Sequence, residues 1–131
     1  MAIRNVMEMV EAAKAEIESI PPEEARAAQE AGALLVDIRD VRELDREGRV
    51  PGAYHAPRGM LEFWVSPGSP YHKPALTDAP RLILFCAASS RSALAVKALR
   101  EMGVEEVAEI EGGFGAWREA GLPVDGGRGS R

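Results

Sequence analysis

Short apolar runs and helical stretches alternate in the second half of the chain. Residues 82–85 and 107–110 predict buried strands, and the first of these runs is too short and too apolar for a surface helix. Residues 92–102 and 114–120 predict helices, and a glycine follows each of them. Strands that alternate with helices predict an α/β domain whose mostly parallel sheet has helices on both faces.

The first half is more varied. Apolar side chains from residue 3 to residue 17 fall on one face of a helix, which either packs on the side of the domain or contacts a partner. Pro21-Pro22 ends that segment, with Ser19 or Ile20 flanking the next helix. The elements expected after it are a helix to Ala31, a strand at 34–36 ending at Asp37, a helix at 40–47, a turn at 50–53, one or two helical turns at 60–65 and a loop at 66–78. We therefore divide the chain into an N-terminal amphipathic helix (1–16), one domain (17–124) and a Gly- and Arg-rich tail expected to be flexible (125–131).

The amino-acid composition and the net charge limit the kinds of partner that we expect. The chain has 131 residues, 46% of them hydrophobic, which is enough for one core. Its net charge of −5 argues against nucleic acid, and most of the acidity lies in residues 1–30. Residues 31–131 are nearly neutral overall, so a locally positive pocket can form among them.

One cysteine and two histidines make a disulfide impossible within the chain and a metal site unexpected. We expect no cofactor. No stretch has the length of a membrane span, and no signal peptide is apparent, so we expect a cytoplasmic protein whose thiol stays reduced.

The single cysteine, Cys86, directly follows the predicted strand at 82–85. In parallel sheets ligands bind beyond the carboxyl ends of the strands. Three features favour a thiolate there: the backbone N–H groups of residues 87–91, the positive end of the next helix, and the charge of Arg91. The alternative is a buried, inert cysteine. A cysteine–histidine pair would need His55 or His72 to be brought in by folding.

Three segments carry a family resemblance, and they occur in this order along the chain: 35–40 (LVDIRD) followed by Arg42-Glu43 and 50–53 (VPGA), 86–91 (CAASSR), and 111–114 (EGGF) followed by Trp117 and 121–124 (GLPV). The chain resembles a single-domain rhodanese, a sulfurtransferase, from about residue 17 to residue 124. The resemblance implies a five-stranded parallel sheet flanked by helices, with Cys86 carrying a transferred sulfur as a persulfide. It also implies a small anionic donor such as thiosulfate, and cyanide, a thiol or a protein as acceptor.

The same resemblance implies roles for other residues. The loop residues Ala87, Ala88, Ser89, Ser90 and Arg91 would bind the anionic donor and the persulfide. Asp37 and Arg39 would brace the site. His55, Arg58 and His72 are further candidates for the mouth of the pocket. Relatives often have glycine at the position of Ser89, a residue type that tolerates positive φ.

Two other classes of function remain open. One is a noncatalytic rhodanese-like module that binds a partner or regulates, although such a module need not retain both Cys86 and Arg91. The other is a small cysteine-dependent phosphatase or arsenate reductase. By resemblance, the four residues between Cys86 and Arg91 favour sulfur transfer, because the related phosphatases have five.

Overall fold

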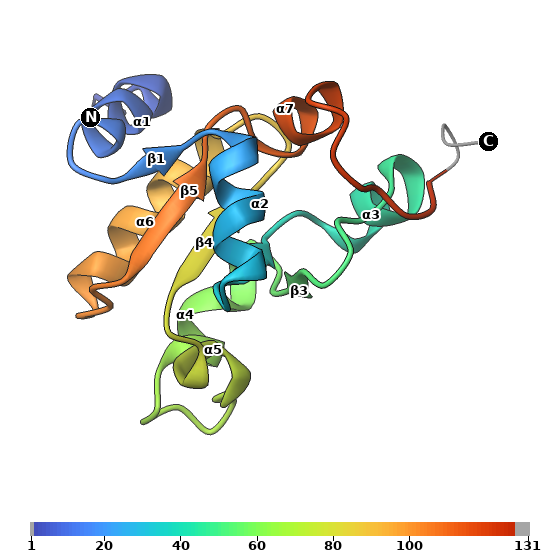
Figure 1. Cartoon of the computed structure of the whole chain (residues 1–131). Coiled ribbons are helices and arrows are strands. Elements are labelled where there is room, and N and C mark those ends of the chain that lie inside the picture. The colour runs from blue at the N-terminus through green and yellow to red at the C-terminus, as the bar shows by residue number, and fades with distance from the viewer. Residues whose placement is uncertain (1, 128–131) are drawn as a thin grey trace.

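Five short strands form one sheet in the computed structural model, which describes residues 2–127 (Figure 1). The strand order is β1-β5-β4-β2-β3. Every pair of neighbouring strands is parallel, so the prediction of a parallel α/β sheet is confirmed. The strands are β1 (Ser19–Ile20), β2 (Leu34–Asp37), β3 (Tyr54–His55), β4 (Leu82–Phe85) and β5 (Val107–Ile110).

Helices cover both faces of this sheet. One apolar core lies between the sheet and α4, α5 and α6, and the other lies between the sheet and α2 and α7. A third, small cluster joins α1 to α6. The helices are α1 (Val6–Lys14), α2 (Pro22–Glu30), α3 (Val41–Glu47), the 3-10 turn η1 (Arg58–Met60), α4 (Leu61–Val65), α5 (Ala75–Asp78), α6 (Ser90–Glu101) and α7 (Gly113–Glu119).

The central position of β4 in the sheet explains why all four of its residues are apolar. Successive side chains of a strand point to opposite faces. Leu82 and Leu84 therefore enter the core under α6, whereas Ile83 and Phe85 enter the core under α2 and α7. Since both faces are covered, all four positions are buried.

Several expectations about element boundaries differ from the structure. The first helix, expected over residues 1–16, spans Val6–Lys14. Ser19 and Ile20 are not a helix flank but the edge strand β1, which exists because they pair with Glu109 and Ile110 of β5. The expected loop at 66–78 contains the short helix α5. Helix α6 begins at Ser90, two residues earlier than expected, directly after the loop that follows Cys86.

Both ends of the described chain contact the domain. Helix α1 begins at Val6, where Asn5 accepts a hydrogen bond from the backbone of Met7. At the other end, Asp125 and Arg49 exchange two backbone hydrogen bonds of 2.8 Å. Residues 128–131 of the predicted tail lie outside the described residues. Within residues 2–127, no helix combines the length and apolar character that a membrane crossing requires.

Candidate active site

Cys86 lies at the carboxyl end of β4, and three residues separate it from the first turn of α6. Its sulfur accepts a hydrogen bond from the Ser89 N–H, with an N–S distance of 3.1 Å. Ser92 Oγ in the first turn of α6 lies 3.6 Å from the same sulfur. Cys86 is only 1% exposed, so the sulfur lies beneath the loop rather than on the surface.

Ser89 has a left-handed backbone, with φ of 116°. Among the described residues it is the only one other than glycine with positive φ. Its hydroxyl is buried, donates to Glu109 Oε1 at 2.8 Å and accepts from Lys14 Nζ at 3.0 Å. The side chain therefore points into the protein, away from any donor bound at the loop.

The Gly112-Gly113 turn forms the back of the loop. The Phe114 N–H donates to the Cys86 carbonyl at 2.8 Å, and the Gly115 N–H donates to the Ala87 carbonyl at 3.1 Å. A Cβ on Gly113 would lie 2.5 Å from the Cys86 carbonyl oxygen, so only glycine permits this approach. These contacts hold two loop carbonyls toward α7.

Arg91 points to α3. Its guanidinium binds both carboxylate oxygens of Glu43, at 2.7 and 3.0 Å. These hydrogen bonds raise the pKa of Arg91, and the nearby Cys86 sulfur acts in the same direction. The hydrogen bonds from Arg91 in turn lower the pKa of the Glu43 carboxyl. The positive charge expected at the loop is present but is matched by a carboxylate.

Asp37, the last residue of β2, forms a buried ion pair with Arg39, and Arg39 Nη2 lies 2.7 Å from Asp37 Oδ2. Arg39 also donates to the Gly48 carbonyl at 2.9 Å, and its guanidinium lies 4.1 Å from the centre of the Phe114 ring. The His55 ring bonds to the Arg39 carbonyl at 2.7 Å. The pair thus joins the end of α3 to α7 beneath the candidate site.

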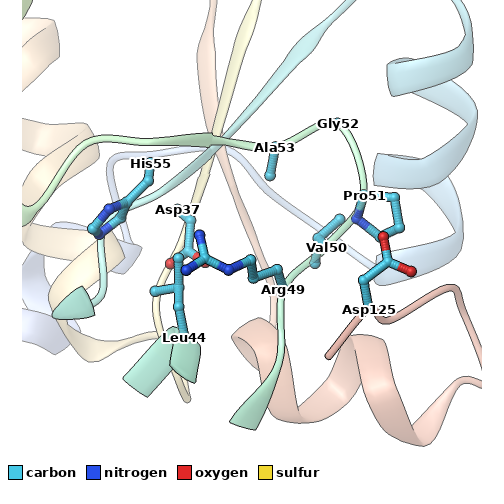
Figure 2. Close-up of a pocket in the computed structure, with 9 residues that line it drawn as sticks. All are labelled: Asp37, Leu44, Arg49, Val50, Pro51, Gly52, Ala53, His55 and Asp125. Atoms are coloured by element: carbon cyan, nitrogen blue, oxygen red, sulfur yellow. The ribbon is translucent and has the colours of Figure 1, made fainter. Parts of the chain in front are cut away.

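Asp37 and His55 line a cavity of about 210 Å³ (Figure 2). Leu44, Arg49, the turn at 50–53 and Asp125 complete its lining, and Cys86 is not part of it. The cavity is therefore separate from the sulfur.

The structure does not bring Arg58 or His72 into contact with the loop. Arg58 forms an ion pair with Glu62 one helical turn away, at 2.6 Å, and lines a groove along α6. His72 bonds to Thr77 of α5, which precedes β4 and lies at the opposite end of that strand from Cys86 (Figure 1).

Sequence reasoning missed Glu43, Glu109 and Lys14, which contact the loop from three other elements. Glu109 had one available signal, since it is the charged residue in a strand predicted to be buried. A charge there requires partners. Glu43 lies in the first segment that carries the family resemblance, but no role at the loop was expected of it. Lys14 lies on an exposed-looking helix face, where no pattern distinguishes it from an ordinary surface charge.

Residues 21–120 match the rhodanese-like domain family. The chain belongs to this family. A thiosulfate sulfurtransferase GlpE from Pseudomonas fluorescens SBW25 is 34% identical to this rhodanese-like chain over 103 residues, which are 79% of the chain and 86% of that protein.

Two solved structures extend the comparison. A protein of unknown function from Rhodopseudomonas palustris CGA009, described as a possible tyrosine phosphatase, has 44% identity and a TM-score of 0.89, covering 95% of this chain and 97% of that one. The polysulfide-sulfur transferase homodimer of Wolinella succinogenes has 32% identity and a TM-score of 0.70, covering 95% and 89%. Helix α1 precedes the residues that match the family.

Proposed function

We propose that this rhodanese-like chain is a sulfurtransferase that moves a sulfane sulfur from an anionic donor to a thiol or cyanide through a persulfide on Cys86. The observation that carries the proposal is the Ser89 N–H on the Cys86 sulfur, at the start of a 12-residue helix. A hydrogen bond to the sulfur and a positive helix end both favour the thiolate.

The first step is a displacement at sulfur. The Cys86 thiolate attacks the outer sulfur of thiosulfate, a new S–S bond forms, and the donor's S–S bond breaks with its electron pair leaving on sulfite. In the second step an acceptor thiolate attacks the outer sulfur of the persulfide and releases the Cys86 thiolate. With cyanide the product is thiocyanate. Neither step needs a proton from a general acid, which suits a sulfur without a histidine beside it.

Burial of the Cys86 sulfur limits the access of a sulfur donor to it. Because Cys86 is 1% exposed, a donor reaches it only when neighbouring side chains move aside. Arg91 carries a positive charge and its side chain is half-exposed, so we assign it the role of attracting the anion. The named activities of two relatives, thiosulfate and polysulfide sulfur transfer, both use small anionic sulfur donors.

Intact-mass spectrometry tests the proposal. The purified protein is incubated with thiosulfate or with polysulfide, then desalted and weighed. We expect a gain of one sulfur atom that cyanide removes as thiocyanate, and no gain in the Cys86→Ser variant. The absence of an adduct with both donors would contradict sulfur transfer and favour a noncatalytic module.

Phosphatase activity is the second candidate, favoured by the similarity to the Rhodopseudomonas palustris protein. The same preparation is therefore assayed with an aryl phosphate. Hydrolysis that disappears in Cys86→Ser, without a sulfur adduct in the wild type, would replace the sulfurtransferase assignment. We expect no such hydrolysis, because four residues lie between Cys86 and Arg91, whereas the related phosphatases have five.

A further inference from the structure

A buried carboxylate lies behind the loop without a role in the proposed chemistry. Glu109 of β5 is fully buried. It accepts hydrogen bonds from the hydroxyls of Ser19 at 2.7 Å, Ser89 at 2.8 Å and Ser92 at 2.6 Å. Lys14 Nζ of α1 lies 3.8 Å from Glu109 Oε2 and donates to the Ser89 hydroxyl at 3.0 Å. The Ser89 hydroxyl is thus held from both sides.

We propose that Glu109 and Lys14 are positioning residues for Cys86. By holding the Ser89 side chain, they keep its backbone in the left-handed conformation that directs the Ser89 N–H at the sulfur. The inference rests on the proposed function in one respect, since it assigns Cys86 the role of nucleophile.

The backbone conformation explains why an anchor is needed. Glycine adopts positive φ freely, whereas a residue with a Cβ is strained in that conformation. Two hydrogen bonds between the Ser89 hydroxyl and charged groups can offset this strain. Lys14 comes from a helix outside the matched family domain, so α1 is a structural part of the candidate active site.

A purely electrostatic effect and the positioning effect predict opposite changes in the reaction rate of Cys86 when the charge of Glu109 is removed. The charged groups around the sulfur are Glu109 with Lys14 on one side, and Arg91 with Glu43 on the other. The Ser92 hydroxyl links Glu109 to Cys86, because it lies 2.6 Å from Glu109 Oε1 and 3.6 Å from the Cys86 sulfur. Removing its negative charge would by Coulomb's law alone favour the thiolate and speed its reactions. Loss of the Ser89 anchor would slow them.

Alkylation of the full-length protein with iodoacetamide measures the thiolate directly, because Cys86 is the only cysteine. In Glu109→Gln we expect the rate near neutral pH to fall about tenfold, the effect of losing one hydrogen bond to a charged atom, and the midpoint of the pH profile to rise by about one unit. An unchanged or faster rate would overturn the proposal.

Lys14→Met tests the same anchor from the surface. We expect a slower rate in this variant also. The matched control is Lys97→Met, because Lys97 pairs with Glu16 of the segment after α1 at 3.2 Å and its side chain is 38% exposed, as is that of Lys14. The control should alkylate within about twofold of the wild type. An equal loss in both variants would show that docking of α1 as a whole, not Lys14, matters, and would overturn the assignment.

Ser89→Gly separates positioning from misfolding. Glycine needs no anchor at positive φ. We therefore expect Glu109→Gln and Lys14→Met to have no further effect in a Ser89→Gly background, so that each double variant alkylates at the rate of Ser89→Gly itself. A further loss of rate in either double variant would overturn a role exerted through Ser89.

These measurements need no sulfur donor. If sulfur transfer is absent while Glu109→Gln slows alkylation, but has no such effect in a Ser89→Gly background, the proposed function fails and the positioning role stands. If sulfur transfer occurs and alkylation is indifferent to Glu109 and Lys14, only the positioning role fails.

Discussion

Arg91 and Glu43 form a two-point ion pair that joins the first turn of α6 to α3. The side chain of Glu43 is 19% exposed and that of Arg91 42%, so the pair faces solvent at the edge of the loop. Glu43 also accepts the Asp40 N–H in the cap of α3. The charge that should attract an anionic donor is therefore partly neutralised in the resting protein.

Glu43→Gln should strengthen donor binding. Removing the carboxylate frees Arg91, so we expect KM for thiosulfate to fall about two- to fivefold with little change in kcat, the size typical of one partly exposed ion pair. Steady-state thiocyanate formation measures both constants. Glu62→Gln, which breaks the Arg58 ion pair, is the matched control and should leave KM unchanged. A higher KM in Glu43→Gln would show that Glu43 holds Arg91 in its productive position.

Gly113→Ala should disrupt the loop from behind. The new Cβ would lie 2.5 Å from the Cys86 carbonyl oxygen, on a backbone with φ of 60°. We expect the free energy of unfolding to fall by about 2 to 4 kcal/mol. Urea unfolding measures this change. In Gly115→Ala the nearest atom is 3.5 Å from the Cβ, so this control should be neutral or stabilising by up to about 1 kcal/mol. Equal effects would contradict the close approach at Gly113.

Asp37→Asn should destabilise the protein strongly. Arg39 is 1% exposed, so loss of its carboxylate leaves a buried charge without an ionic partner. We expect a loss of about 3 to 5 kcal/mol in the free energy of unfolding. Glu18→Gln breaks the Arg81 ion pair near the surface and should cost at most about 1 kcal/mol. Similar losses in the two variants would mean that the buried Asp37–Arg39 pair contributes no more to stability than a surface ion pair.

Acid should weaken the cap of α3. Hydrogen bonds from Arg42 lower the pKa of Asp40 from 3.8 to about 2. A lowered pKa in the folded state means that the contribution is complete above pH 3.8 and is lost as the pH falls toward 2. Asp40→Asn retains an acceptor at the cap but does not titrate. Thermal unfolding followed by circular dichroism should therefore show a steeper acid loss in the wild type, and parallel curves would contradict this.

Local sequence was sufficient for the frame of the site. The four residues 82–85 are apolar because both faces of β4 are covered, and that requirement is visible without a structure. Cys86, the polar loop and the following helix are contiguous, so chain connectivity alone places the sulfur beside the start of α6. The Gly112-Gly113 pair also marked a turn, although its approach to the Cys86 carbonyl was not predictable.

Contacts between distant segments were decided only by the tertiary structure. Ser19 and Ile20 become a strand because β5 pairs with them, and two residues have too little periodicity of their own to indicate it. Arg91 is matched by a residue 48 positions away, and Ser89 by residues 75 and 20 positions away. Hydrogen bonds and ion pairs of this kind depend on where side-chain ends meet in space, which no local pattern records. The sequence thus determined where Cys86 lies and which helix follows it, whereas the fold decided which charged side chains hold the loop around it.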